Sequence, residues 1–341
     1  MPVSIAAIGF GRHFRRSLLP NLLGCERFTL SAIAEKDPET RAEAATRFPG
    51  LPVLSDAKEV LDSPVDAVLI STHPAGHVEL TRAALQAGKH VFVEKPLGTD
   101  PAAVRELAAL AREQHRTVAV GTMWRHAPAH RLVDQWLAEH HAAARLLDIA
   151  VSFPSVYARD GWDLSAEELA FYDMFIHPLD WARHLLGGVG DVDAVLLGGA
   201  RDGEVTTCIR LLSPSGEAVA TINATTGSHA YQVATWLHTT TGDLIEVDTK
   251  DRLRVTTSPT WSGTEGSLRD RATLGWEAGQ LYRGWARKGY AEELTAFADR
   301  IEAPSPHTEP DVSELDGAAD TLELIGRCLS QIQPGISAAA I

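Results

Sequence analysis

The segment Val68–Asp100, VLISTHPAGHVELTRAALQAGKHVFVEKPLGTD, decides the fold. It predicts a strand over Ala67–Ser71, an amphipathic helix over Val78–Ala87 and a second strand over His90–Val93. Both strands are short apolar runs, and the helix between them is long enough to connect two parallel neighbours. This order is typical of a parallel sheet whose strands are joined by helices.

The same pattern continues on both sides of this segment. Further strands are expected over Val3–Ile8, Thr29–Ala34 and Thr117–Gly121, and further helices over Pro38–Phe48 and Pro101–Gln114. The last helix opens with Asp100-Pro101, an acidic N-cap followed by proline at the first helical position. The N-terminal part of the chain is therefore expected to be an α/β domain with a parallel sheet.

The pattern changes to longer alternating strands from about Leu146, and these predict a second domain with an open, largely antiparallel sheet. The expected strands are Leu146–Phe153, Asp193–Gly199, Glu204–Leu212, Ala218–Ala224, Tyr231–Thr239 and Leu244–Asp248, read as a meander. Helices are expected over Ser165–Leu186, Tyr290–Arg300 and Asp311–Ile332. We place the boundary near Thr122–Met123, which gives domains 1–123 and 124–341.

Composition excludes several classes of protein. The chain has 341 residues and a formal net charge of −14, which repels a phosphate backbone, so nucleic acid is not an expected partner. Its three cysteines cannot form a disulfide framework and have no zinc-binding spacing. The N-terminus does not resemble a signal peptide, and no apolar run reaches membrane-spanning length. We expect a cytoplasmic protein that does not bind a membrane.

A glycine turn follows the first strand directly. Gly9-Phe10-Gly11-Arg12-His13-Phe14 stands between a strand and a helical segment. In a dinucleotide-binding fold the first glycine allows the tight turn, the second lets the backbone approach a pyrophosphate, and the helix N-terminus supplies amide donors. Phe14 replaces the third small residue of this motif. An ordinary strand-to-helix turn is the alternative, which the flanking strand and helix make less favourable.

Glu35 ends the second strand where a dinucleotide fold places its ribose-binding carboxylate. A carboxylate there accepts hydrogen bonds from ribose hydroxyls and repels a 2′-phosphate, which favours NAD over NADP. Nearby positive charges could still receive a phosphate, so NADP stays open as the cofactor. They are Lys36, Arg12, Arg15 and Arg16.

The second half contains an Asp-x-x-x-His spacing at Asp173 and His177, followed by Asp180. Residues four apart in a helix project from one face, so these side chains are expected to face one cleft. A carboxylate beside an imidazole stabilises its protonated form, which suits a general base. An Asp–His pair that bridges or caps helices would have the same spacing, and spacing alone does not decide between the two.

The segment that decides the fold also resembles, almost position by position, the family of glucose-fructose oxidoreductase, inositol dehydrogenase and rhizopine-catabolism oxidoreductase (Gfo/Idh/MocA). The matching residues are Ser71-Thr72-x-Pro74-x-x-His77, Ala87-Gly88-Lys89-His90-Val91, Glu94-Lys95-Pro96-Leu97 and Val120-Gly121-Thr122-Met123-Trp124-Arg125. Asp173 and His177 look like the family's Asp-x-x-x-His motif, although the glycines that commonly precede it are absent. The resemblance implies a Rossmann domain, a second α/β domain and a nicotinamide-dependent oxidoreductase.

Site residues follow from this resemblance together with the motifs above. The expected catalytic residues are Lys95, Asp173 and His177. The expected cofactor-binding residues are Gly9, Phe10, Gly11, Arg12, His13, Glu35, Thr72, His73, His77, Glu94, Lys95 and Trp124. Expected substrate contacts are Lys95, Tyr157, Arg159, Trp162, Asp173 and His177. The histidine pairs His73/His77 and His126/His130 each contain an intervening proline, so no metal site is expected.

The predicted reaction is hydride transfer between NAD, or NADP, and a secondary alcohol or ketone of a sugar, polyol or related small polar substrate. Two alternatives remain: an NAD-dependent glycoside hydrolase on the same fold, and a non-catalytic dinucleotide sensor. A sensor has no need of the proton-transferring set Lys95, Asp173 and His177. A sheet covered by helices on one side only would expose a broad face, so a homodimer or homotetramer is expected.

Overall fold

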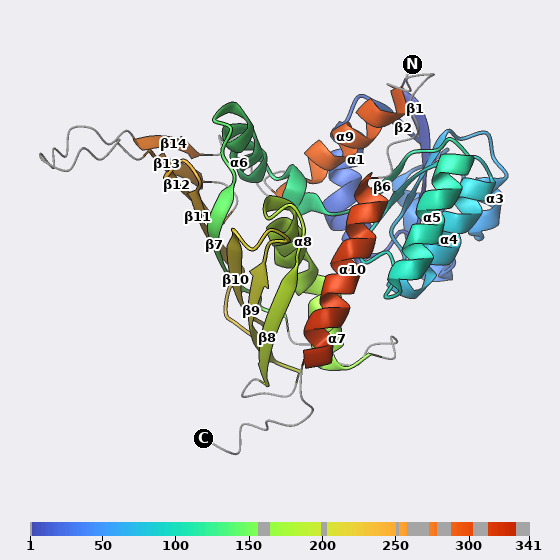
Figure 1. Cartoon of the computed structure of the whole chain (residues 1–341). Coiled ribbons are helices and arrows are strands. Elements are labelled where there is room, and N and C mark those ends of the chain that lie inside the picture. Colours follow the sequence, from blue (N-terminus) through green and yellow to red (C-terminus); the bar gives the residue numbers. More distant parts are fainter. Residues whose placement is uncertain are drawn as a thin grey trace, which may run out of the picture. The chain divides into compact units, whose positions relative to one another are not determined.

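The computed structural model describes residues 2–155, 164–198, 203–249, 252–257, 273–277, 288–302 and 313–331. The chain divides into two compact units, whose elements are labelled in Figure 1. The first unit contains Met1–Met123 and Gly289–Leu322, and the second contains Trp124–Lys288 and Glu323–Ile341. The chain therefore leaves the first unit after Met123, returns to it at Gly289 and leaves it again after Leu322.

The first unit is built on a six-stranded parallel sheet. Its strands are β1 (Val3–Ile8), β2 (Phe28–Ala34), β3 (Val53–Leu54), β4 (Ala67–Ile70), β5 (His90–Val93) and β6 (Val118–Val120). They lie in the order β3-β2-β1-β4-β5-β6, and every pairing is parallel. The order reverses between β1 and β4, which creates a crevice at the carboxyl ends of these two strands. The expected parallel α/β domain is confirmed.

Helices connect these strands. They are η1 (Phe14–Leu18, a π-helical segment), α1 (Leu19–Gly24), α2 (Pro38–Arg47), α3 (Ala57–Leu61), η2 (Pro74–Gly76), α4 (His77–Gln86), α5 (Pro101–Glu113), α9 (Tyr290–Glu302) and the first part of α10 (Ser313–Gln331). The N-cap expected at Asp100 is present, because its carboxylate accepts a hydrogen bond from the Ala102 amide at 2.9 Å. Asp37 caps α2 in the same way through Thr40.

Helix α9 packs on the first unit although it is far away in sequence. The Phe297 ring lies 5.8 Å from Phe28 on β2 and 6.0 Å from Phe92 on β5. Phe297 is fully buried, and α9 lies beside α1 (Figure 1). Truncating a buried phenylalanine typically costs about 3–5 kcal/mol, so this contact is a substantial part of the core of the first unit.

The second unit contains an eight-stranded sheet. Its strands are β7 (Ala144–Ser152), β8 (Asp191–Gly198), β9 (Val205–Leu212), β10 (Val219–Thr225), β11 (Gln232–Thr239), β12 (Leu244–Asp248), β13 (Arg252–Thr256) and β14 (Thr273–Glu277). Their order is β14-β13-β12-β11-β7-β10-β9-β8. β7 lies inside the sheet and pairs in parallel with β10, while the other pairings are antiparallel. The largely antiparallel sheet is confirmed, but a simple meander is wrong, because helices and two strands separate β7 in sequence from its neighbour β10, and three strands separate it from β11.

Helices cover one face of this sheet. They are η3 (Met123–His126), α6 (Pro128–Glu139), α7 (Ala166–Ala170), η4 (Phe171–Phe175, a π-helical segment) and α8 (Ile176–Leu185). The helix expected over Ser165–Leu186 is thus present as α7, η4 and α8 in succession. α8 packs on β7 and β10, and α7 packs on β9. Along β9 buried side chains alternate with more exposed ones, as a sheet covered on one face requires.

Candidate active site

The glycine turn lies at the crevice between β1 and β4. Gly9 has φ +97°, and a Cβ placed on it would lie 2.4 Å from the Ser71 carbonyl oxygen at the end of β4. Only glycine fits this position, because both its backbone conformation and its contact exclude a side chain. A Cβ on Gly11 would meet no atom of the described residues within 4 Å, so a ligand can approach the backbone there.

Phe14 changes how the first helix begins. Its ring is fully buried and lies 5.9 Å from the Phe10 ring, where the usual motif has a small residue. The helical conformation begins at Arg12 and His13 and continues as the π-helical segment η1 from Phe14. π-helical turns within helices are rare and occur frequently at functional sites. Arg12 and His13, immediately before this segment, are exposed at the turn.

Glu35 is held against the glycine turn. Its Oε2 accepts a hydrogen bond from the Phe10 amide at 2.7 Å, and its Oε1 accepts one from the Asp37 amide at 2.9 Å. The carboxylate is therefore oriented by backbone donors beside the turn. Lys36, the next residue in sequence, is exposed, and so is Arg12 in the glycine turn. This is the position at which a ribose would be recognised in a dinucleotide fold.

Glu94 and His13 connect the end of β5 to the glycine turn. His13 Nε2 lies 3.0 Å from Glu94 Oε1, and the Lys95 amide donates to Glu94 Oε2 at 3.2 Å. Glu94 is only 5% exposed. Burial alone would raise the pKa of Glu94, but His13, Lys95 and His77 together lower it below its ordinary value. Glu94 is therefore a buried carboxylate that keeps its negative charge.

His77 joins the carboxyl ends of β4 and β5. Its Nδ1 lies 2.9 Å from the Pro96 carbonyl oxygen and its Nε2 lies 3.1 Å from the Thr72 carbonyl oxygen. Burial lowers the pKa of His77, against the opposing effect of these carbonyls and of Glu94. His73 is exposed, and its Nδ1 accepts from the Ala75 amide at 3.3 Å. The structure thus brings the expected cofactor residues of the first unit to one edge of the parallel sheet.

The second unit holds Asp173 and His177. Asp173 lies in η4 and is half-buried, while His177 is on α8 and is 4% exposed. The His177 ring stacks on Trp124, with ring centroids 5.8 Å apart and planes inclined by 8°. His130 lies 5.5 Å from Trp124 and stacks on Trp181 at 4.3 Å. An aromatic cluster therefore fixes the position of the His177 imidazole.

Trp124, expected among the cofactor-binding residues, begins the second unit and is 1% exposed. Its contacts with His177 and His130 make it a support for the imidazole. The expected catalytic set is likewise divided, because Lys95 belongs to the first unit and Asp173 and His177 belong to the second.

Asp180 has a partner that the spacing did not indicate. It is 2% exposed and accepts two hydrogen bonds from Arg125, at 2.6 Å from Nε and 2.5 Å from Nη2. Arg183 approaches it to 3.7 Å. The carboxylate of Asp180 is engaged by this two-point ion pair, and the expectation that it faces a reaction cleft together with Asp173 and His177 stays a prediction.

Three of the expected substrate contacts lie outside the described residues. They are Tyr157, Arg159 and Trp162. Across the described ranges, no group of three or more His, Cys, Asp or Glu side chains is arranged to hold a metal ion. Over the same part of the chain, none of the helices combines the length and the apolar character that crossing a membrane requires.

Sequence reasoning missed one ionisable residue beside the predicted cofactor site. Glu293 on α9 is 2% exposed and lies in the same unit as Glu94. Burial, followed by the charges of Glu94, Glu314 and Glu292, raises the pKa of Glu293 well above its ordinary value. No local pattern indicates this position, because it depends on the return of α9 to the first unit.

Known proteins resemble this chain in sequence and in fold. Residues 3–122 match the family model described as "Oxidoreductase family, NAD-binding Rossmann fold" (GFO_IDH_MocA). Levoglucosan dehydrogenase of Pseudarthrobacter phenanthrenivorans is 28% identical over 262 residues, 65% of this chain and 66% of that enzyme. The dTDP-3,4-didehydro-2,6-dideoxy-alpha-D-glucose 3-reductase of Actinomadura kijaniata is 30% identical over 234 residues, 67% of this chain and 70% of the reductase.

A solved structure extends the similarity to both units. The dehydrogenase from Chromobacterium violaceum has a TM-score of 0.83 and 23% sequence identity, and the alignment covers 96% of this chain and 95% of that one. At this level of identity the comparison shows that the two proteins share a fold.

Proposed function

Because the chain belongs to the Gfo/Idh/MocA family of oxidoreductases with an NAD-binding Rossmann fold, we propose that it transfers a hydride between a nicotinamide cofactor and a secondary alcohol or ketone carbon. The substrate class is a sugar, a polyol or a related polar molecule, as the names of the relatives indicate. These relatives are a dehydrogenase and a reductase, which favours net hydride transfer over glycoside cleavage. The cytoplasm is the compartment that we propose for this activity.

The single observation that supports this function most is the glycine turn against β4. The backbone of Gly9 packs against the Ser71 carbonyl group. Glu35 accepts a hydrogen bond from the Phe10 amide of the turn, and Glu94 pairs with His13. The backbone amides of Gly11 and Arg12 and the start of η1 would hold the pyrophosphate of the dinucleotide, and Glu35 would accept hydrogen bonds from its ribose. The other residues of this group, Phe10, Thr72, His73 and His77, line or support the same edge.

Lys95, Asp173 and His177 perform the proton chemistry. A bound nicotinamide ring would supply the redox chemistry, as acceptor of the hydride from the C–H bond of an alcohol. His177 accepts the hydroxyl proton, and Asp173 stabilises the imidazolium that results. Lys95 places positive charge beside the oxygen on which negative charge develops. In the reverse direction His177 returns the proton to the oxygen. Substrate lies in the second unit, with Tyr157, Arg159 and Trp162 as further proposed contacts.

A spectrophotometric screen tests this function. Sugars and polyols are offered with NAD and NADP, and the matching ketones with NADH and NADPH, while absorbance at the reduced nicotinamide band is recorded. We expect substrate-dependent formation or consumption of reduced cofactor. Cleavage of a glycoside without net change in cofactor would instead identify the hydrolase alternative, and cofactor binding without turnover on any substrate would identify a sensor.

Glu35 is expected to select NAD over NADP. Its carboxylate is fixed by the amides of Phe10 and Asp37, so it cannot easily turn away from a 2′-phosphate. Glu35→Gln keeps the shape of the side chain and removes its charge, and it should raise the NADP-to-NAD ratio of kcat/KM by about tenfold, equivalent to about 1.4 kcal/mol. Glu39→Gln, an exposed carboxylate on α2, is the control and should leave the ratio unchanged. A wild-type preference for NADP contradicts the assignment.

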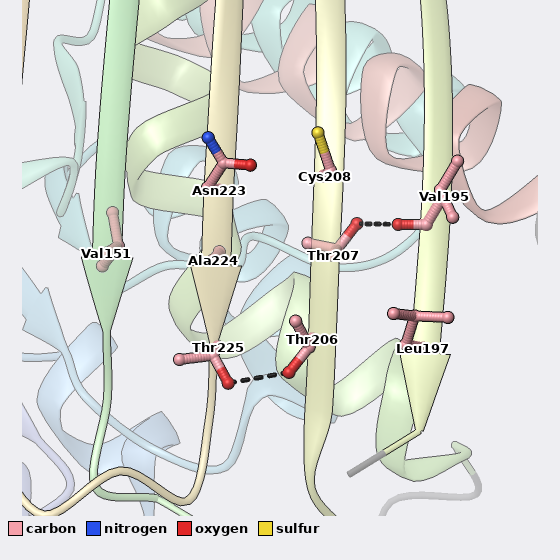
Figure 2. A pocket seen from close by; sticks show the side chains of 9 residues that line it. All are labelled: Val151, Val195, Leu197, Thr206, Thr207, Cys208, Asn223, Ala224 and Thr225. Atoms are coloured by element: carbon pink, nitrogen blue, oxygen red, sulfur yellow. Dashed lines mark hydrogen bonds between the residues drawn. The ribbon is translucent and has the colours of Figure 1, made fainter. Parts of the chain in front are cut away.

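The uncovered face of the eight-stranded sheet is the proposed subunit interface. Among the described residues, every exposed large apolar side chain except Leu23 lies on this sheet: Leu146, Val195, Leu197, Leu212, Trp236 and Leu274. Figure 2 shows a pocket of about 270 Å³ on this sheet, where Val195 and Leu197 stand beside Cys208, Asn223 and Thr225. Apolar side chains concentrated on one sheet in this way fit a second copy of the chain.

We therefore expect a dimer or tetramer by light scattering at micromolar concentration. Leu197→Glu should shift the mass toward the monomer, because it places a charge among the apolar side chains of the proposed contact. Leu23→Glu introduces the same charge at the exposed apolar position outside the sheet and should preserve the assembly. A monomeric mass for the wild-type protein excludes the proposed interface.

A further inference from the structure

Glu293 is a buried carboxyl group for which the proposed mechanism has no use. It lies on α9 and is 2% exposed, and among the described residues no N–H or O–H donor lies within hydrogen-bond distance of either of its carboxylate oxygens. A charged carboxylate in such a place loses its hydration without any compensation. Glu293 therefore needs either a proton of its own or an acceptor beside it that shares one.

The packing of α9 places Glu293 beside Glu94. One turn after Glu293, Phe297 contacts Phe92 on β5 at 6.0 Å, and Glu94 lies two residues after Phe92 on the same side of that strand. Before Glu293, Tyr290 contacts the His13 ring at 5.9 Å, and His13 is the partner of Glu94. The two aromatic contacts bracket Glu293 and place it near the end of β5, where the charge of Glu94 acts on its carboxyl group.

The donors around the two carboxyl groups decide which one is charged. Glu94 faces His13 Nε2 at 3.0 Å and accepts from the Lys95 amide at 3.2 Å, and these donors favour its ionised form. Glu293 faces no such donor among the described residues. Two adjacent buried carboxylates cannot both carry charge without a large cost, so the proton resides on Glu293.

We infer that Glu293 is a neutral carboxylic acid that donates a hydrogen bond to Glu94 and so holds this carboxylate toward His13 and the cofactor. It is a positioning residue, because it acts through Glu94. The inference rests on the proposed function only in placing Glu94 beside the cofactor.

The charges around the pair are consistent with this assignment. The groups that surround it are His13 after β1, Glu94 and Lys95 after β5, His77 on α4, Tyr290, Glu292 and Arg300 on α9, and Glu314 on α10. Burial and then the carboxylates of Glu94, Glu314 and Glu292 raise the pKa of Glu293 well above its ordinary value. Glu314 is itself engaged, by Arg300 Nη1 at 2.6 Å and the Val120 amide at 2.8 Å.

The first test compares two substitutions by their affinity for NADH, measured from NADH fluorescence. Glu293→Gln keeps a donor for Glu94 and should bind NADH within about twofold of wild type. Glu293→Leu has a similar size without a donor, and its Kd should rise about tenfold, as expected for loss of a hydrogen bond to a charged group. Glu113→Gln, an exposed carboxylate on α5, is the control.

Two readouts on the protein without cofactor identify the proton directly. The infrared spectrum at pH 7 should contain a protonated carboxylic-acid carbonyl band that Glu293→Gln removes and Glu113→Gln does not. The second readout is the free energy of unfolding as a function of pH. Because the folded protein holds this proton above the ordinary pKa of 4.5, the wild type loses stability relative to Glu293→Gln as the pH rises above 4.5.

The results separate this inference from the proposed function. If wild-type protein does not bind NADH, the proposed function fails, while the infrared band and the pH dependence of stability still decide where the proton lies. If NADH binds but Glu293→Leu has wild-type affinity, Glu293 does not position Glu94. If the infrared band is absent, Glu293 is ionised and the inference is overturned.

Discussion

Replacing His177 by alanine should lower kcat by about 10²–10⁴-fold, the usual contribution of a general base, while the affinity for NADH stays close to that of the wild type. His177 is buried in the second unit and fixed against Trp124, whereas the expected cofactor contacts other than Trp124 belong to the first unit. The substitution should therefore slow the proton-transfer step and leave cofactor binding unchanged. Steady-state kinetics and NADH titration on the same preparation measure both quantities.

A structural role for His177 predicts a different result. Loss of the stacking contact with Trp124 would lower the melting temperature and leave the activity of each folded molecule intact. His184→Ala is a suitable control, because His184 lies on the same helix and forms a half-exposed pair with Asp134 at 2.9 Å. Near-normal kcat in folded His177→Ala would remove His177 from the mechanism and leave Lys95 as the proton carrier. Lys95→Ala should also lower kcat, and it should weaken ligand binding as well.

The second large effect concerns stability. Asp180→Ala should lower the free energy of unfolding of the second unit by about 3 kcal/mol, the lower end of the range for breaking a buried ion pair. The carboxylate of Asp180 is nearly inaccessible, but the Arg125 side chain is 20% exposed, so water can partly solvate the guanidinium after its partner is removed. The substitution leaves Arg125 and Arg183 with uncompensated positive charge at a largely buried site.

Tryptophan fluorescence during chemical denaturation reports this effect selectively. All eight tryptophans fall between residues 124 and 288, within the second unit, so the signal does not include unfolding of the first. Asp134→Asn removes the half-exposed pair with His184 and is the matched control, with an expected loss of about 0–1 kcal/mol. An equally small loss for Asp180→Ala would mean that the Arg125 pair does not stabilise the unit.

Local pattern predicted the parts of the fold that depend on local chemistry. The segment Val68–Asp100 contains β4, α4 and β5, and the turn at Gly9 lies where its conformation and close contact require glycine. The very short β3 and α3 were missed, because two and five residues hold too little periodicity to identify an element. The internal position of β7 was missed as well, since it depends on how strands distant in sequence pair.

In the candidate site, too, local pattern predicted some features and missed those that depend on contacts between distant segments. Helical spacing correctly placed Asp173, His177 and Asp180 on consecutive helical segments, yet it could not reveal that Arg125, far away in sequence, engages Asp180. Likewise, Glu94 could be identified from its motif, but Glu293 could not, because only the packing of Phe297 on Phe92 brings the two carboxyl groups together. Contacts between distant segments carry this information, and no single window of sequence contains it.

The return of the chain to the first unit at Gly289 has a consequence for synthesis on the ribosome. At about 5–20 residues per second, the interval between the emergence of Met123 and that of Glu302, the end of α9, is roughly 10–35 s. Throughout this time the surface around Phe28 and Phe92 lacks the helix that covers it, while the whole of 124–288 can fold. A nascent chain that stopped before Gly289 would contain every described strand of both sheets. Its nucleotide-binding unit would still expose the apolar surface that α9 covers, and this unit would therefore be prone to aggregate and to bind chaperones.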